Sequence, residues 1–284
     1  MIIEDKSDSR TDISKIELTP VFEAISCQYG YSLDKYSKKF LQRRIEKCLI
    51  KYKLRDTIEM AARLKRDQRF FESILLEFSV LVTEAFRDPS VFLAIRKNVI
   101  PILKTYPFIK IWHAGCASGE EAYSMAIILH ETGLLERATI YATDFNGEAL
   151  SKSYEGKISE KALSLYAQNY QEAGGTRSFS NYYIEKNGVL YFCDFLRKKI
   201  LFAHHNLAHD ETFSEMHMVF CRNVMIYFDK ELQTRAIHLF GNSSVHRGFL
   251  CLGNKESIKF INSNNIYEPF LEKERIYRKK SSGV

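Results

Sequence analysis

The stretch Ala114-Gly115-Cys116-Ala117-Ser118-Gly119-Glu120-Glu121 decides the fold of this chain. Its small residues allow the backbone to turn sharply and to approach a bound ligand closely. It joins an apolar strand pattern at 108–113 to an apolar-periodic helix pattern at 120–130. The beginning of such a helix offers unpaired N–H groups and a partial positive charge. The stretch therefore predicts a ligand-binding turn at the carboxyl end of a strand.

The glycine spacing indicates what kind of ligand this turn binds. Gly115 and Gly119 form a G-x-x-x-G pattern, not the G-x-G-x-x-G pattern of dinucleotide-binding turns. The carboxylates of Glu120 and Glu121 would repel a pyrophosphate. They suit a ligand with a cationic amino group and a sulfonium, so the turn favours an adenosyl ligand of that kind.

Asp144 is the second polar residue at this predicted edge. It ends the strand pattern at 139–143 and lies 25 residues after Gly119. An acid in this position accepts hydrogen bonds from both hydroxyls of a ribose. The alternative is that Asp144 caps a helix at 147–154. The glycine turn upstream favours the ribose role.

Strand and helix patterns continue to alternate along the chain. Strand patterns at 217–221 and 248–252 flank a helix pattern at 230–240, and the tail at 266–279 is expected to close the sheet as a last strand. This alternation predicts a parallel sheet with crossover helices. Between 179 and 205, Asn187-Gly188 separates two β-type runs and predicts a hairpin. The expected fold class is α/β and Rossmann-like, with a small antiparallel β insert at about 179–200.

The preceding part of the chain has a helical pattern. We expect a disordered tail at 1–16, a small all-α domain at 17–82, and a linker at 83–107 with one helix bent near Pro101. The ligand-binding domain then covers residues 108–284.

Charge is distributed unevenly over these parts. The formal net charge is +6, yet residues 30–70 alone hold 13 Lys and Arg against 5 Asp and Glu, leaving about −2 for the rest. This asymmetry indicates an anionic partner for the helical domain, the alternative being a solvated helix face. Nucleic acid is not expected, because the segment lacks the interleaved aromatic residues of an RNA-stacking platform.

Composition excludes several other classes. The chain is 45% apolar, but it contains no run of 18 or more apolar residues and no secretory signal, so membrane insertion is not expected. Six scattered cysteines signal neither a zinc site nor a disulfide framework, which favours a reducing, cytoplasmic setting. His204, His205 and His209 lack matching acids or cysteines, so no metal site is predicted.

Five stretches resemble the CheR family, the SAM-dependent protein-glutamate methyltransferases of bacterial chemotaxis (SAM is S-adenosyl-L-methionine). They are Ala114–Ser124, Ala142–Asp144, Asn206–Leu207, Phe220–Asp229 with its sequence FCRNVMIYFD, and Thr83–Asp88, which is similar to the family's T-x-F-F-R-D. The resemblance covers about residues 17–280. Ala85 replaces the first Phe of the F-F pair, which predicts looser packing of this segment over the cofactor.

The resemblance implies roles for particular residues. Glu120 binds the methionine amino group, with neighbouring Glu121 as the alternative, and Asp144 binds the ribose. The other implied cofactor-binding residues are Thr83, Arg87, Gly115, Ala117, Asn206, Leu207, Arg222 and Asn223. Arg87 and Tyr227 face the point of methyl transfer and are the expected catalytic residues.

The resemblance also implies the reaction and the partner. The expected substrate is a glutamate side chain in the cytoplasmic domain of a methyl-accepting chemotaxis receptor, and the expected product of SAM is S-adenosyl-L-homocysteine (SAH). A carboxylate nucleophile is already ionised at pH 7, so no general base is needed. The oligomeric state stays open, with a monomer as the working expectation. Two alternatives remain: a methyltransferase acting on RNA or a small molecule, and a SAM-binding regulatory protein that has lost activity.

Overall fold

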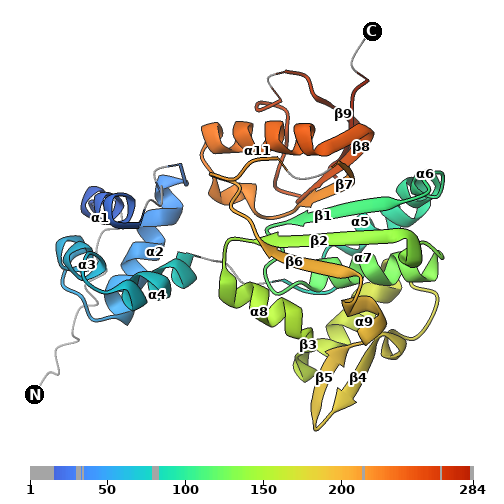
Figure 1. Cartoon of the computed structure of the whole chain (residues 1–284), viewed down its shortest axis with the longest axis horizontal. Coiled ribbons are helices and arrows are strands. Elements are labelled where there is room, and N and C mark those ends of the chain that lie inside the picture. The colour runs from blue at the N-terminus through green and yellow to red at the C-terminus, as the bar shows by residue number, and fades with distance from the viewer. Residues whose placement is uncertain are drawn as a thin grey trace, which may run out of the picture. The chain divides into compact units, whose positions relative to one another are not determined.

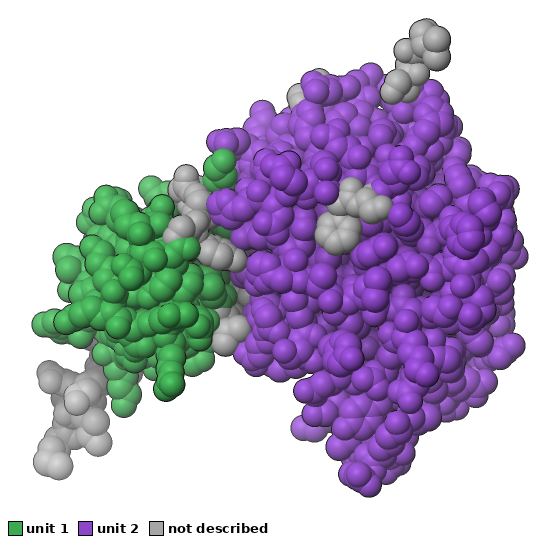
Figure 2. All heavy atoms as spheres, in the orientation of Figure 1, with its two compact units in different colours: residues 1–79 green, residues 80–284 purple. Residues whose placement is uncertain are grey.

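The computed structural model describes residues 16–29, 33, 35–78, 83–212, 215–262 and 264–281. The chain divides into two compact units, Met1–Ser79 and Val80–Val284, which are coloured separately in Figure 2. The predicted disordered tail lies outside the described residues, apart from Ile16. No helix in the described parts of the chain is both long enough and apolar enough to cross a membrane.

The first unit is all-α, as predicted (Figure 1). Its helices are α1 (Thr19–Tyr29), α2 (Lys38–Lys51), α3 (Thr57–Leu64) and α4 (Gln68–Phe78). The apolar positions of α2 that recur at helical spacing, Phe40, Leu41 and Ile45, are buried. The ring of Tyr29 stacks on that of Phe71 with 3.7 Å between centroids, so α1 and α4 share this core.

The second unit is built on a seven-stranded sheet (Figure 1). In spatial order its strands are β6 (Ile200–His204), β2 (Ala138–Asp144), β1 (Ile109–Ala114), β7 (Met216–Cys221), β8 (Ser244–Leu252), β10 (Ile276–Lys279) and β9 (Tyr267–Leu271). The first five are mutually parallel, whereas β10 runs antiparallel to both of its neighbours, β8 and β9. The carboxyl ends of the parallel strands therefore meet at one edge of the sheet. The predicted α/β, Rossmann-like class is confirmed.

Helices cover both faces of this sheet. They include α7 (Glu120–Glu131), α8 (Gly147–Glu155), α9 (Leu163–Glu172), α10 (Asp194–Arg197) and α11 (Lys230–Ser243). In Figure 1, α11 lies on one side of the sheet, and α7 and α8 lie on the other. This arrangement buries both faces, which explains the nearly continuous apolar character of the central strand β1.

The segment predicted as a linker packs within the second unit. Its helical part runs through α5 (Pro89–Ala94), the π-helical turn η2 (Ile95–Val99) and α6 (Ile100–Leu103). The wide turn stands directly before Pro101, which has no N–H to donate to the preceding turn and whose ring crowds it. The inward side chains of this helix, among them Phe92, belong to the main core.

The small antiparallel insert is present and includes the predicted hairpin. Strand β5 (Val189–Phe192) pairs with β4 (Tyr183–Lys186) on one side and with β3 (Lys157–Ile158) on the other. Asn187 and Gly188 have φ values of 52° and 74°, the left-handed conformation that a two-residue hairpin turn requires. In Figure 1 the hairpin projects from the rest of the unit.

One strand was not predicted, and one prediction was wrong in detail. The predicted insert ends at about residue 200, where Ile200–His204 forms β6 and pairs in parallel with β2 at the edge of the main sheet. An edge strand is mostly exposed, so it lacks the buried apolar run of a central strand. The tail forms two strands, β9 and β10, and not one. The turn between them contains Arg275 at φ 56°, and it has no glycine from which the sequence could have predicted a turn.

Candidate functional site

The predicted site residues gather at the carboxyl ends of the parallel strands. The glycine turn follows β1, Asp144 ends β2, Arg222 follows β7, and Asn206 comes shortly after β6. Open α/β sheets bind ligands at this edge, where the loops leave the sheet in different directions. The fold thus brings together residues that are more than 100 positions apart.

The turn after β1 needs its glycines. Gly115 has φ 77° and donates its N–H to the carbonyl of Thr143 at 2.8 Å. A Cβ on Gly115 would lie 2.6 Å from Cγ2 of Val224, closer than real Cβ atoms come. Only glycine therefore combines this backbone conformation with this close contact to the loop after β7. Ala117 also has a positive φ of 48°, so the turn is tight throughout.

Asp144 is buried, with 7% of its surface exposed. Its two carboxylate oxygens accept hydrogen bonds from the backbone N–H groups of Ala117 and Asn146, each at 2.9 Å. Burial raises the pKa of Asp144, and these hydrogen bonds counteract part of that effect. Asn146, not Asp144, caps α8, because its side chain accepts from Glu148 and Ala149. The helix-cap alternative for Asp144 is therefore wrong.

Glu120 begins α7 and is also buried, at 9% exposure. Its carboxylate accepts a hydrogen bond from the hydroxyl of Ser118 at 2.9 Å and another from that of Tyr166 on α9. Burial raises the pKa of Glu120. Among the described residues no cationic side chain pairs with it. A buried carboxylate whose hydrogen-bond donors are all neutral fits a cationic ligand group, such as an ammonium.

The neighbouring Glu121 is engaged by the protein itself. Its carboxylate contacts Nδ1 of His113 and a terminal nitrogen of Arg222, both at 2.9 Å. Burial alone would raise the pKa of Glu121, but the hydrogen bonds and charges of His113 and Arg222 outweigh it and lower this pKa. Of the two acids that the sequence left as alternatives, Glu120 is the one that no cationic side chain among the described residues contacts.

Arg222 is the predicted ligand whose geometry fits a cofactor least. Its side chain is 1% exposed, and its terminal nitrogens contact Asp88 at 2.6 Å, Glu121 at 2.9 Å and the carbonyl of Arg87 at 3.1 Å. Three protein acceptors thus occupy the guanidinium. The prediction that Arg222 binds the cofactor finds no support in this arrangement.

The segment with the T-x-F-F-R-D resemblance is tied down at several points. The N–H of Phe86 donates to Oγ of Ser124 at 2.8 Å, and Asn169 donates to the carbonyl of Ala85 at 3.1 Å. Ala85 is fully buried. Asn169 on α9 thus holds the segment at this alanine, and looser packing over the cofactor stays a prediction. Thr83 and Arg87 are half-buried within the same segment.

The remaining predicted residues lie on two short connections, one after β6 and one between β7 and α11. Asn206 accepts from the N–H of Ala208 at 2.9 Å, which shapes the turn that buries Leu207. Asn223 follows β7 in a left-handed conformation with φ 61°. Tyr227 ends the short helix η6 (Met225–Tyr227) and is half-buried.

Sequence reasoning missed Glu256, which shapes the loop after β7. This carboxylate is 4% exposed and accepts hydrogen bonds from the N–H groups of Asn223 at 3.0 Å, Val224 at 3.0 Å and Gly253 at 2.6 Å. Burial raises its pKa, and these donors counteract part of the effect. Its position could have indicated a role at the site. Glu256 is an acid four residues after the apolar strand β8, and the carboxyl end of β8 lies at the same edge of the sheet as Asp144.

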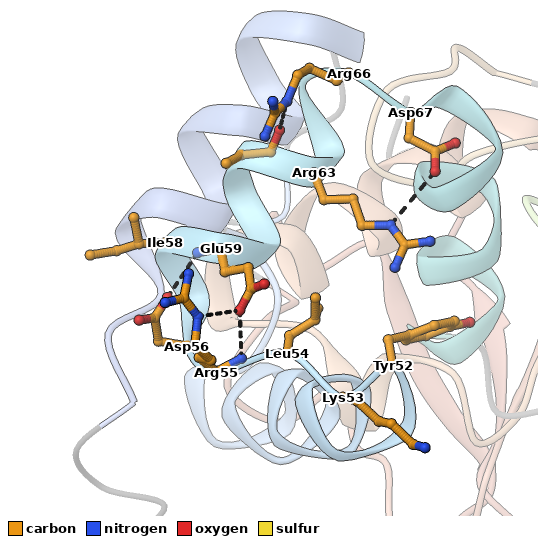
Figure 3. Close-up of a pocket in the computed structure, with 11 residues that line it drawn as sticks. Tyr52, Lys53, Leu54, Arg55, Asp56, Ile58, Glu59, Arg63, Arg66 and Asp67 are labelled. Atoms are coloured by element: carbon orange, nitrogen blue, oxygen red, sulfur yellow. Dashed lines mark hydrogen bonds and ion pairs between the residues drawn. The ribbon is translucent and has the colours of Figure 1, made fainter.

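The first unit has a separate groove, with a volume of about 700 Å³ (Figure 3). Four cations line it: Lys53, Arg55, Arg63 and Arg66. Neighbouring acids neutralise two of them, because Arg55 contacts Glu59 at 3.0 Å and Arg63 contacts Asp67 at 3.6 Å. Much of the local excess of basic residues in this groove is thus balanced within the unit.

His204, His205 and His209 belong to no cluster of potential metal ligands among the described residues. Among the described residues, no group of three His, Cys, Asp or Glu side chains could hold a metal ion. His205 packs edge-to-face against the buried ring of Trp112, with centroids 5.2 Å apart. This contact places His205 in the core beside the sheet.

A Rossmann-like sheet, a glycine turn and two buried acids at its carboxyl edge fit the class of SAM-dependent methyltransferases, whose cofactor is SAM. The sequence model described as "CheR methyltransferase, SAM binding domain" matches residues 81–274. The chain belongs to the CheR methyltransferase family, which confirms the resemblance seen in the sequence.

Curated relatives extend beyond the matched domain. The Cher3 protein of Pseudomonas putida is 44% identical over 273 residues, which are 96% of this chain and 99% of that protein. A "Chemotaxis protein methyltransferase" of Listeria innocua is 29% identical and covers 81% of this chain and 85% of its own. Another of that name, from Borreliella burgdorferi, is 26% identical and covers 90% and 93%.

Proposed function

We propose that this enzyme transfers the methyl group of SAM to glutamate side chains in the cytoplasmic domain of a chemotaxis receptor, forming methyl esters. The observation that carries the proposal is the pair of buried acids at the glycine turn, together with the contact that joins Arg222 to the main-chain carbonyl of Arg87. The acids suit SAM, and an arginine near the methyl suits an anionic acceptor. The names of the Listeria and Borreliella relatives support the choice of acceptor.

Each acid has a distinct part in holding the cofactor. Glu120 binds the ammonium of the methionyl end, and Asp144 accepts from the ribose hydroxyls through lone pairs that its backbone donors leave available. Asn206 and Leu207 flank the adenine, while Thr83 closes over the methionyl end. The bound cofactor supplies a methyl group on a sulfonium, which is already activated for transfer.

The protein then has to orient an acceptor that needs no deprotonation. A glutamate carboxylate has an ordinary pKa of about 4.3 and is ionised at pH 7. Arg87 orients one carboxylate oxygen, and the hydroxyl of Tyr227 donates to it. Alignment and the removal of water from the carboxylate provide the rate enhancement.

A row of cations on α2 supports a separate docking role for the first unit. Lys39, Arg43 and Lys47 are four residues apart, so they share one face of the helix. All three are exposed, and no ion pair joins them to another described residue. This face suits an acidic surface on the receptor beside its methylated glutamates.

A methylation assay with two candidate acceptors tests this proposal. The full chain is incubated with methyl-labelled SAM and either a receptor cytoplasmic domain or RNA. We expect label in the receptor that is released as methanol by mild base, which is diagnostic of a methyl ester. Base-stable label, or label in RNA, would show a different substrate. SAH binding without any transfer would favour a regulatory protein.

A further inference from the structure

The backbone on both sides of Arg87 is in a sparsely populated conformation. Phe86 has φ 54° and Asp88 has φ 57°, values that favour glycine and that a bulky phenylalanine rarely adopts. Such residues persist only where the surrounding structure holds them, and they cluster at functional sites. The conformation therefore raises the question of what holds this segment in place.

Arg222, which follows strand β7, contacts this segment at two residues. One terminal nitrogen contacts the carboxylate of Asp88 at 2.6 Å and the main-chain carbonyl of Arg87 at 3.1 Å. The same guanidinium lies over the ring of Phe92, 5.6 Å from its centroid. A single side chain thus grips two consecutive residues of the segment, including the backbone of Arg87 itself.

The position of Arg222 is itself fixed by a second carboxylate, that of Glu121. Its other terminal nitrogen contacts Glu121 at 2.9 Å, and the second oxygen of Glu121 contacts Nδ1 of His113 at 2.9 Å. The ring of His113 is fully buried and stacks on Phe220 with centroids 4.3 Å apart. The guanidinium is therefore locked between two carboxylates and has little freedom to turn toward a ligand.

We propose that Arg222 is a positioning residue, which clamps the strained backbone at 86–88 so that the side chain of Arg87 meets the acceptor carboxylate. This inference rests on the proposed function, because Arg87 is given its role there. It changes the expected role of Arg222 from a cofactor ligand to a support of the acceptor site. Loss of the clamp should then affect turnover and leave cofactor affinity nearly intact.

Two variants remove the clamp from opposite ends. Arg222→Lys keeps the charge, but an ammonium cannot reproduce the planar fork that reaches both acids and the carbonyl. Asp88→Asn keeps the shape of its side chain and removes the charge. We expect kcat for receptor methylation to fall by roughly 10- to 100-fold in each, the size expected for a misplaced orienting group. The Kd for SAH, measured by calorimetry, should stay within about twofold.

A matched control separates this effect from a general loss of stability. Arg96 forms a buried ion pair with Glu131 at 2.5 Å, with side-chain exposures of 10% and 3%, in the same unit. Arg96→Lys should lower the Tm comparably and leave kcat unchanged. The double variant Arg222→Lys with Asp88→Asn should be no slower than the slower single variant. The reason is that both changes break the same contact, between Arg222 and Asp88.

Several results would overturn the inference. Unchanged kcat in both variants would show that no clamp is needed. A Kd for SAH that rises as much as kcat falls in Arg222→Lys would make Arg222 a cofactor ligand. If the wild-type enzyme methylates no receptor, the proposed function is wrong, but this result does not decide whether Arg222 holds residues 86–88. Amide hydrogen exchange then tests the contact of Arg222 with this segment. Both variants should then exchange faster at residues 86–88 than the wild type, and equal rates would contradict the proposal.

Discussion

Two adjacent glutamates at the beginning of α7 have opposite electrostatic surroundings. Glu120 has hydroxyl partners and a raised pKa, whereas Glu121 has His113 and Arg222 as partners and a lowered pKa. Burying a carboxylate without a cation costs free energy that a bound ammonium can recover. This contrast supports the proposed role of Glu120 in binding the cofactor, whereas Glu121 is paired within the protein.

Replacing Asp144 tests the ribose contact directly. Asp144→Asn keeps one acceptor for the backbone but offers the ribose a donor where two hydroxyls need acceptors. We expect affinity for SAH to fall by about 10- to 100-fold, since hydrogen bonds to charged groups contribute about 1.5–3 kcal/mol. Calorimetry measures this change.

A matched control is Asp229→Asn, which changes a carboxylate that caps α11 by accepting from Leu232. Asparagine caps helices about as well as aspartate, so this variant should bind SAH like the wild type. Equal affinities of Asp144→Asn and wild type for SAH would contradict the ribose assignment.

The raised pKa of Glu120 predicts pH-dependent cofactor binding. Below this pKa the carboxylate is protonated and loses its attraction for the ammonium, so affinity for SAM should fall as the pH decreases through it. Because the raised pKa lies above the usual value of about 4.3, the loss should begin at a higher pH than for an exposed glutamate.

5′-Methylthioadenosine provides the control for this pH profile, because it keeps the ribose and lacks the amino group. In the wild type, the difference in affinity between SAM and 5′-methylthioadenosine should become smaller as the pH decreases. In Glu120→Gln this difference should be nearly independent of pH. A parallel dependence for both ligands in the wild type would assign the effect to Asp144 instead.

At the scale of elements, the close approach between the loops after β1 and β7 fixes the shape of the site. Gly115→Ala introduces both backbone strain and a contact of 2.6 Å with Val224. Gly133→Ala introduces similar strain, with φ 72°, but its Cβ meets nothing within 4 Å. We expect Gly133→Ala to cost about 1–2 kcal/mol of unfolding free energy and Gly115→Ala roughly 1–3 kcal/mol more.

Chemical denaturation measures both variants, and SAH calorimetry shows whether the site is affected. Only Gly115→Ala should weaken SAH binding. Equal stability losses in the two alanine variants would mean that the contact with Val224 is unimportant.

Glu256 ties the loop after β8 to the loop after β7. Glu256→Gln directs an amide NH2 toward the backbone donors that the carboxylate accepts, so at least one of them loses its partner. We expect a loss of about 1–3 kcal/mol, or roughly 2–12 °C in Tm, together with weaker SAH binding. The control Glu148→Gln removes an exposed pair with Lys152 and should change stability by less than about 0.5 kcal/mol. An unchanged Tm in Glu256→Gln would contradict this account of the loop.

Local patterns predicted the elements whose cause is local. The glycine turn, the strand ending at Asp144 and the Asn187-Gly188 hairpin each depend on residues within a few positions of one another. The edge strand β6 was not predicted because it is defined by its pairing with β2, not by a pattern in its own sequence. The Arg222 contacts join residues more than 100 positions apart, and spacing along one chain carries no signal for such a pairing.

At the scale of the whole molecule, all the proposed cofactor residues lie in the unit Val80–Val284. Residues 80–284 alone should therefore bind SAH with an affinity within about twofold of the full chain. The same fragment should lose most receptor methylation, because the cation row on α2 is absent.

In the full chain, reversing Lys39, Arg43 and Lys47 to glutamate should reproduce that loss and leave SAH binding intact. Receptor methylation by the wild type should also weaken as salt increases, since exposed charges are screened. A fragment that methylates the receptor at the full rate would contradict a docking role for the first unit.

The structure of the full chain crystallised with SAH tests the central claim most directly. We predict that the ribose hydroxyls contact the carboxylate of Asp144, that the amino group contacts Glu120, and that Arg222 keeps its contacts with Asp88 and Glu121. Ligand density away from the turn at Gly115–Gly119, or a ribose with no contact to Asp144, would contradict the account.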